Sequence, residues 1–266
     1  MKLQGARVLL TGAAGGIGSA IAQALAKKGA QLALLDRGVA ELEPLLGTLR
    51  DTGNSAHGLE ADLLDHAARV AAVEHAHRLL GGIDMLVNCA GLISFRPLVE
   101  EDPLLLERII RLNLVVPMLL ARQVLPEMLG RGSGRVVNIG STFGSIGFAW
   151  FAVYSASKFG VRGLSEALRR ELDGSGVGVT YVAPRAVKTK FNSDAVYRMA
   201  QATGMNMDEP GWVATRIVTA IEQDAKDVYL GFPERLFARL NGLAPRLVDG
   251  GLRKQTRAMA GFARGA

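Results

Sequence analysis

The sequence predicts an α/β fold: a doubly wound, seven-stranded parallel sheet with helices on both faces, followed by a helical extension at the C-terminus. Short apolar runs alternate with longer amphipathic runs along the chain. The short runs carry apolar residues at consecutive positions, as strands covered on both faces do. No linker, internal repeat or low-complexity tract interrupts this alternation before residue 232. We therefore expect a single α/β domain over residues 1–231 and a separate extension over residues 232–266.

The elements follow in order from these runs. The apolar runs predict strands at residues 7–11, 31–36, 55–60, 83–88, 134–139, 178–183 and 227–230. The amphipathic runs between them predict helices, the clearest at residues 16–28, 39–51, 66–80, 103–129 and 152–172. Glycines such as Gly29 and Gly53 stand where the predicted helices end.

Composition and charge exclude several classes of protein. The only cysteine is Cys89, so neither an intrachain disulfide nor a thiolate metal cluster can form. No window approaches about 18 uninterrupted apolar residues, and the N-terminal apolar run is too short for a signal peptide. We therefore expect a cytoplasmic protein. From Glu234 onward, seven basic and two acidic residues carry +5 of the net charge of +6, so the body itself does not indicate nucleic-acid binding.

A glycine-rich loop follows the first predicted strand directly. It reads Thr-Gly-Ala-Ala-Gly-Gly-Ile-Gly over residues 11–18 and runs into a good helix. Glycines let a backbone turn tightly and approach a pyrophosphate, while a helix N-terminus offers free N–H groups. This Rossmann-type arrangement predicts a dinucleotide site that includes Gly12, Ala14, Gly16, Ile17 and Gly18.

Asp36 ends the second predicted strand, where a carboxylate can accept the ribose hydroxyls of an adenosine. It also fits a helix cap. An aspartate at this position repels a 2′-phosphate and favours NAD, whereas the adjacent Arg37 can pair with such a phosphate and would suit NADP. The sequence leaves both cofactors open and favours NAD.

Tyr154 and Lys158 are four residues apart on a predicted helix, so both side chains lie on one face. A phenol with a pKa of about 10 is a poor base at neutral pH, and a nearby cation is expected to lower that pKa. Ser141 ends the fifth predicted strand, where it can hydrogen-bond the same substrate oxygen. This group predicts proton exchange with a substrate hydroxyl.

Together these motifs resemble the short-chain dehydrogenase/reductase family, in its short single-domain branch. The loop at 11–18 is similar to TGxxxGxG, and residues 88–91 (Asn-Cys-Ala-Gly) to NNAG. Residues 184–189 (PRAVKT) are similar to PGxVxT. The resemblance implies cofactor contacts from Asp62, Leu63, Asn88, Ala90, Gly91, Tyr154, Lys158, Pro184, Val187 and Thr189.

The resemblance also implies a mechanism. Tyr154 would act as general acid/base and Ser141 would polarise the substrate oxygen. Lys158 would lower the pKa of the tyrosine and hold the nicotinamide ribose, and Asn113 would anchor a water that relays protons to Lys158. The product would be a ketone or aldehyde formed from an alcohol, or the reverse.

Two positions depart from the family pattern. Cys89 replaces the second Asn of NNAG, and we interpret it as a small buried residue. Arg185 replaces the glycine after Pro184 and puts a cation near the substrate entrance. An acidic substrate group would fit it, but a surface arginine is the favoured interpretation.

The four histidines do not predict a metal site. His75 and His77 are two residues apart on a predicted helix and diverge, whereas helical ligands need a spacing of four. We expect solvated histidines and no metal.

Aromatic residues and methionines gather in the two segments that follow Ser141 and Thr189, which predicts an apolar, adaptable substrate pocket. A hydrophobic alcohol or ketone is the expected substrate, although about half of these side chains would serve only to close the loops. The candidates are Phe143, Ile146, Phe148, Trp150, Phe151, Phe191, Val196, Tyr197, Met199, Met205 and Met207.

The extension places Leu236, Leu240, Leu243 and Leu247 at spacings of four and three with arginines between them, so we expect an amphipathic basic helix broken at Pro245. Three roles compete: packing on the body or a second subunit, contact with an anionic membrane surface, and capping of the substrate entrance. Helices 103–129 and 152–172 resemble those that pair subunits in the family, so we expect a homodimer or homotetramer.

Two other functions remain to be weighed. A non-catalytic dinucleotide sensor or scaffold on the same fold would be expected to lose the tyrosine or the lysine, and both are present. Reduction of a carbon–carbon double bond usually goes with a tyrosine and a lysine seven apart, whereas here they are four apart.

Overall fold

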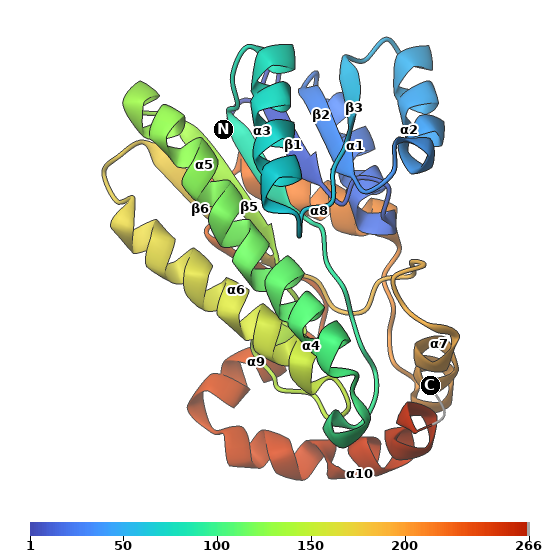
Figure 1. The fold of residues 1–266 in the computed structure, drawn as a ribbon. Helices are drawn as coiled ribbons and strands as arrows, with labels where there is room; N and C mark the ends of the chain where they lie inside the picture. Colours follow the sequence, from blue (N-terminus) through green and yellow to red (C-terminus); the bar gives the residue numbers. More distant parts are fainter. Residues whose placement is uncertain (265–266) are drawn as a thin grey trace.

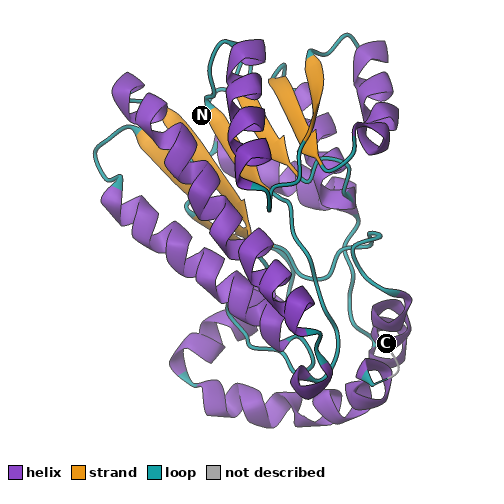
Figure 2. Cartoon of the chain, viewed as in Figure 1, coloured by secondary structure: helices purple, strands orange, loops and turns teal. Residues whose placement is uncertain are grey.

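Seven parallel strands form one sheet in the order β3-β2-β1-β4-β5-β6-β7, in the computed structural model that describes residues 1–264 (Figures 1 and 2). The predicted doubly wound sheet is therefore confirmed. The strands are β1 (Arg7–Thr11), β2 (Gln31–Asp36), β3 (Ala56–Glu60), β4 (Met85–Asn88), β5 (Gly134–Ile139), β6 (Val177–Ala183) and β7 (Asp227–Tyr229).

Helices cover both faces of the sheet because alternate strand residues point to opposite sides. In β1, Val8 and Leu10 pack with one set of helices, whereas Leu9 packs with the other. The first set is α1 (Gly16–Ala26), α2 (Val39–Asp51) and α8 (Pro210–Glu222). The second is α3 (His66–Leu80), α5 (Val116–Arg131) and α6 (Ala152–Glu171).

The predicted helix at 103–129 is three segments. Helix α4 (Pro103–Ile110) passes into a π-helical turn (Arg111–Val115) and then into α5. The turn lies where the Asn113 side chain leaves the helix surface to bond the backbone of Leu92. That tertiary contact, which is not visible in the helical periodicity, accounts for the interruption.

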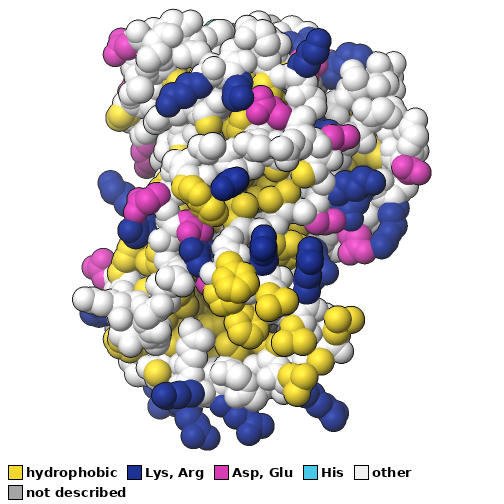
Figure 3. All heavy atoms as spheres, turned by 180° about the vertical axis from the view of Figure 1, so that it is seen from behind, with side chains coloured by type: hydrophobic (Ala, Val, Ile, Leu, Met, Phe, Trp, Pro, Cys, Tyr) yellow, Lys and Arg dark blue, Asp and Glu magenta, His cyan; other side chains and the backbone are white. Residues whose placement is uncertain are grey.

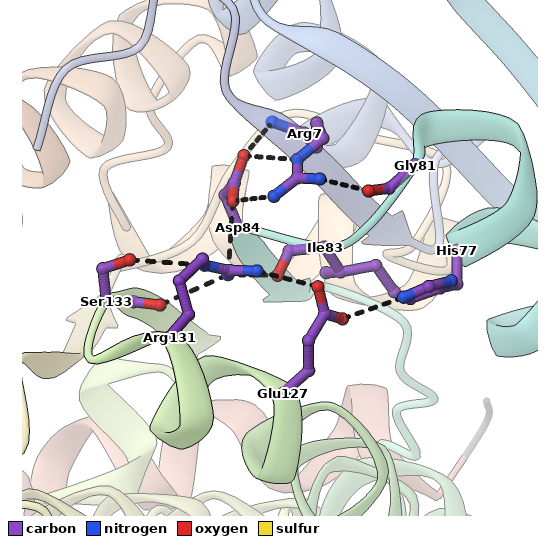
Figure 4. A network of polar contacts seen from close by, with 8 residues as sticks. All are labelled: Arg7, His77, Gly81, Ile83, Asp84, Glu127, Arg131 and Ser133. Atoms are coloured by element: carbon purple, nitrogen blue, oxygen red, sulfur yellow. Dashed lines mark hydrogen bonds and ion pairs between the residues drawn. The ribbon is translucent and has the colours of Figure 1, made fainter.

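An ionic network joins the elements at the end of the sheet where the strands begin (Figure 4). Arg7 donates to Asp84 from its backbone N, from Nε at 2.8 Å and from Nη2 at 2.6 Å. Arg131 of α5 adds a contact with Asp84 at 3.2 Å, and Glu127 links Arg131 to His77 of α3. This network fixes the sheet at the end opposite to the glycine loop.

The C-terminal extension is present as two helices, α9 (Glu234–Leu243) and α10 (Pro245–Ala263). The break at Pro245 is confirmed, since proline begins α10 and cannot continue α9. Both helices pack on the body of the same chain along its lower end, with α10 beside α7 (Asp194–Thr203) (Figure 1). Trp150 Nε1 donates to the carbonyl of Thr256 at 3.2 Å. Of the three roles weighed for the extension, packing on the body is therefore observed.

Candidate active site

The glycine loop between β1 and α1 leaves its backbone bare toward a cleft. Gly12 has a φ of +67°, a conformation that favours glycine, and a Cβ on Gly18 would lie 2.1 Å from the Gly12 carbonyl oxygen. No side chain caps the N-terminus of α1, and its first turn contains no acidic residue. Free N–H groups and the positive end of the helix dipole therefore face the cleft, which suits a pyrophosphate.

The cleft has a volume of about 980 Å³ and continues into a smaller apolar hollow of about 130 Å³. The structure brings together nearly all of the predicted cofactor residues along these two walls: Gly12, Ala14, Gly16, Ile17, Gly18, Asp36, Arg37, Asp62, Leu63, Ala90, Gly91, Tyr154, Lys158, Pro184, Val187 and Thr189.

Asn88 is the exception among the predicted cofactor residues. It is buried in β4 and absent from both walls, and its Nδ2 donates to Asn138 Oδ1 of β5 at 2.8 Å. Asn138 donates in turn to Ser165 of α6 at 2.9 Å. The side chain of Asn88 therefore ties strands and helix together, and the prediction that it contacts cofactor is not supported by its position.

Asp36 lies at the end of β2 and holds the glycine loop. Its carboxylate accepts from Ala14 N at 2.9 Å and from Arg37 N at 2.8 Å. The side chain of Arg37 is exposed on the same wall of the cleft. Asp36 thus fixes the loop and also presents a negative charge where an adenosine ribose would lie.

Ser141, Tyr154 and Lys158 meet in the apolar hollow, as predicted. Ser141 follows β5 and caps a short 3₁₀ turn by accepting from Phe143 N at 3.1 Å, which fixes its side chain. Tyr154 and Lys158 stand one turn apart on α6, and Lys158 Nζ lies 5.6 Å from the centre of the Tyr154 ring. Lys158 Nζ donates to the carbonyl of Ile139 at 2.9 Å.

The low Tyr154 pKa that was expected beside Lys158 is not found, because burial sets the net direction of the shift. Burial raises the pKa of Tyr154 to about 12, and a hydrogen bond with the Ser141 side chain only partly opposes this. Burial also lowers the pKa of Lys158 to about 8. The two groups are 8 % and 6 % exposed, so loss of hydration is the largest influence on both pKa values. Tyr154 is a proton donor at neutral pH in this environment.

Asn113 lies under the hollow and does not line it. Its side chain exchanges two hydrogen bonds of 2.8 Å with the backbone of Leu92, and Nδ2 also donates to Ser157 Oγ at 3.0 Å. Both N–H groups of the Asn113 amide are therefore used, and the side chain has no donor left for a further partner. The π-helical turn at this position alters the regular backbone bonding of the helix.

The sequence favoured a surface arginine at position 185, and this interpretation is wrong. The Arg185 guanidinium is held by other residues of the chain and is not free for a substrate. Its guanidinium binds Asp208 at two points, Nη2 to Oδ1 at 2.7 Å and Nε to Oδ2 at 3.0 Å. It also contacts Glu234 at 3.2 Å and donates to the carbonyl of Phe232 at 3.2 Å. We call this group of ion pairs the Arg185 clip. It joins the segment that follows β6 to the start of α9. The partners come from distant parts of the chain, so only the fold reveals them.

Six of the eleven predicted pocket residues line the hollow: Phe143, Phe151, Phe191, Val196, Met199 and Met205. The others pack elsewhere. Tyr197, for example, donates to the carbonyl of Thr189 on the cleft wall, and Ile146 packs under the extension. The Tyr154 ring stands 6.2 Å from the rings of both Phe143 and Phe191, so the phenol is set in an apolar wall.

Cys89, interpreted from the sequence as a small buried residue, is half-buried, packs against the core and also lines both parts of the cleft. It follows β4 at the edge where the sheet opens. Desolvation raises the pKa of its thiol to about 12, so the group is a neutral thiol at neutral pH.

Some wall residues were not predicted. Lys190 and Arg108 are exposed cations on the wide part of the cleft, and Ile93 lies in the wall of the apolar hollow. Ile93 follows β4, and the carboxyl ends of parallel strands share one edge of the sheet. Its position near the cleft could therefore have been predicted from the sequence. No sequence pattern predicts that Arg108, on α4, lies in the wall of the cleft. Among residues 1–264, no cluster of His, Cys, Asp or Glu is arranged to hold a metal.

Comparisons with known proteins agree with this architecture. The short chain dehydrogenase family model matches residues 6–199. The ketoacyl reductase HetN of Nostoc sp. is 35 % identical over 227 residues, which cover 85 % of this chain and 78 % of that protein. A short-chain dehydrogenase from Sphingobium yanoikuyae, solved with NADPH, has a TM-score of 0.78 at 30 % identity and covers 91 % of this chain and 94 % of its own. A Burkholderia phymatum dehydrogenase solved with NAD shares the fold, with a TM-score of 0.84 at 24 % identity and 93 % and 96 % coverage.

A doubly wound sheet that carries a bare glycine loop, a long cleft and a serine–tyrosine–lysine group defines a dinucleotide-dependent oxidoreductase. The chain belongs to the short-chain dehydrogenase/reductase family, whose members act on CH–OH groups with NAD(P).

Proposed function

We propose that this protein interconverts an apolar alcohol and its ketone or aldehyde, with Tyr154 as the general acid/base. The observation that carries the proposal is the position of Tyr154: it shares the apolar hollow with Ser141 and stands among phenylalanines at the inner end of the cleft. Residues 1–231 would supply both the cofactor and the substrate sites.

The residues of the glycine loop fit a nicotinamide dinucleotide. The free N–H groups at the start of α1 would bind the pyrophosphate, Asp36 the adenosine ribose, and Lys158 the nicotinamide ribose. When bound, this cofactor supplies or accepts the hydride. NADPH and NAD in the related structures support a cofactor of this class. The charge of Asp36 favours NAD for this chain.

In the direction of reduction, Tyr154 gives its proton to the substrate oxygen. Its raised pKa keeps it protonated at neutral pH, and Ser141 hydrogen-bonds the same oxygen and orients it. Lys158 holds its positive charge at pH 7, close to the phenol, and stabilises the phenolate as it forms. The surrounding aromatic residues exclude water, which strengthens these interactions. Asn113 would position a water for return of the proton through Lys158.

The substrate is an apolar alcohol or ketone in this proposal, because the hollow around Tyr154 is lined by aromatic and methionine side chains. We also propose a cytoplasmic location, a homodimeric or homotetrameric assembly, and contact of the basic extension with an anionic membrane surface; the reaction itself does not depend on these three.

A cofactor titration combined with a turnover screen tests the proposal. Intrinsic fluorescence would give the Kd of NADH and NADPH for the wild type and for Tyr154→Phe, and ketones of increasing apolar chain length would then be screened. We expect equal cofactor affinity for both proteins and a kcat/KM lower by about 10²–10⁴-fold in the variant. If Tyr154→Phe turns over as fast as the wild type, the mechanism is wrong. Cofactor binding without turnover of any ketone or alcohol would favour a sensor or scaffold.

The variant Asp36→Asn tests the cofactor preference. Asparagine keeps an acceptor for Ala14 N and removes the negative charge. We therefore expect the affinity for NADPH to rise relative to that for NADH. An unchanged ratio would show that Asp36 does not decide the preference.

A further inference from the structure

The two helices of the extension present one continuous face to solvent. Helical spacing puts Ala238, Val248, Met259 and Ala263 on the inner side, where they are buried against the body. The opposite side, which we call the basic face, is formed by exposed residues of both helices: Leu236, Arg239, Leu243, Arg246, Leu247, Arg253, Lys254 and Arg257. Figure 3 shows lysine and arginine side chains projecting along this end of the molecule.

The cations of the extension are not neutralised by the chain itself. None of its seven basic residues makes an ion pair with any residue in 1–264, whereas Arg7, Arg131 and Arg135 all do. Of the two acidic residues in the extension, Glu234 is held in the Arg185 clip, which leaves Asp249 as the other negative charge. The face therefore carries a strong, uncompensated positive potential.

Large apolar side chains stand on the same face. Leu243 is 88 % exposed, Leu247 68 % and Leu236 57 %. A Cβ added at Gly250, on the same side of α10, would meet no atom of residues 1–264 within 4 Å, so no described part of the chain covers the face at that point. Single exposed leucines are ordinary, but here three are spaced along one helical face and separated by arginines.

We propose that the basic face docks reversibly on an anionic lipid surface. The arginines would contact lipid phosphates while the leucines enter the headgroup region, as in interfacial amphipathic helices. Because no helix within residues 1–264 is long and apolar enough to cross a membrane, the contact is peripheral. A nucleic acid would match the cations, but the leucines on the same face would be left against its phosphates, so lipid fits the whole face better.

Docking also bears on how substrate arrives. The inner side of α10 places Met259 and Ala263 against Phe151 and Met199, which line the apolar hollow. The helix that lies on the lipid would thus back the pocket, and an apolar substrate could enter from the bilayer. This last step rests on the proposed function, whereas docking itself does not.

Vesicle flotation tests the docking independently of activity. The full-length protein would be mixed with phosphatidylcholine vesicles, with or without about 30 % phosphatidylglycerol, at salt near 0.05 M and 0.5 M. We expect it to float only with the anionic vesicles, and less at high salt. Reversal of Arg246, Arg253 and Arg257 to Glu should weaken partition by at least roughly 100-fold. The control reverses the same number of exposed cations, Lys2, Lys27 and Arg78, at the opposite end of the molecule. It should bind anionic vesicles far better than the variant with the reversed basic face.

A second variant, Leu243→Ser/Leu247→Ser, tests the apolar contribution and keeps every charge. It changes only exposed positions and should lower partition roughly tenfold or more. Equal flotation with neutral and anionic vesicles, undiminished binding by the charge variant, or an unaffected serine variant would each overturn the proposal. Binding to duplex DNA without binding to anionic vesicles would assign the face to nucleic acid instead. NADH binding by every variant separates these outcomes from a failure of the active site.

Discussion

The Arg185 clip should contribute measurably to stability, and unequally through its two carboxylates. Asp208 receives two hydrogen bonds of 2.7 and 3.0 Å from Arg185, and its side chain is 10 % exposed. Glu234 is 27 % exposed and its shortest contact is 3.2 Å. Charge-assisted, bidentate bonds in a half-buried setting contribute about 2–3 kcal/mol, whereas a partly exposed single contact contributes about 0.5–1 kcal/mol.

Two double-mutant cycles test this difference. One combines Arg185→Met with Asp208→Asn, and the other combines Arg185→Met with Glu234→Gln. The backbone of Asp208 should stay in place, because its N–H donates to the Ala186 carbonyl at 2.8 Å. For a chain of this size, loss of about 2.5 kcal/mol lowers Tm by roughly 5–10 °C. Urea unfolding would measure the coupling free energies, and hydrogen exchange would report whether α9 opens more often.

The matched control is Arg216→Met on α8, an exposed arginine that lies over the ring of Trp212 at 5.5 Å. It should cost no more than about 1 kcal/mol. A coupling below about 0.5 kcal/mol between Arg185 and Asp208, or a larger one with Glu234, would refute the reasoning.

Three further predictions concern single positions. In Gly16→Ala the new Cβ would lie 2.4 Å from Thr189 Cγ2, so NADH affinity should fall by roughly tenfold or more, with partial rescue by Thr189→Ser in a fluorescence titration. Burial lowers the pKa of Lys158 to about 8, so between pH 8 and 10 the unfolded chain binds more protons than the folded one. The free energy of unfolding of the wild type, measured with urea, should therefore rise with pH relative to that of Lys158→Met, by at most about 1.4 kcal/mol per pH unit. A difference between the two proteins that does not change with pH would contradict this. Arg7 holds the pKa of Asp84 below its usual value, so Asp84→Asn should cost about 2 kcal/mol at pH 7. This cost should fade as the pH falls below the unfolded carboxyl pKa of about 4 and through the lower pKa of the folded state. A constant cost in acid urea titrations would count against the network of Figure 4.

Much of the fold and of the site could be predicted from local patterns. The strand runs and the glycine loop are contiguous in sequence, and a parallel α/β fold brings the carboxyl ends of its strands to one edge. Ser141 and Asp36 therefore reach the cleft whatever the details of packing. The spacing of Tyr154 and Lys158 on one helix likewise fixes their relative direction.

The predictions that the structure corrected depend on interactions between segments that are distant in the sequence. The sequence indicated the chemistry of Arg185, but its partners at 208 and 234 are 23 and 49 residues away and meet it only after the chain has folded. The π-helical turn at Asn113 has the same origin, since the side chain is drawn to Leu92. The order of pKa values at Tyr154 and Lys158 depends on burial, which spacing does not report.

The sequence by itself determined the sheet, the glycine loop and the identity of the reacting groups, because periodicity and short motifs act through neighbouring residues. Only the tertiary structure decided how far Tyr154 and Lys158 are desolvated, what Arg185 binds, and which side of the extension faces outward. Those properties are set by long-range packing, where hydration is lost and charges find partners that no local pattern encodes.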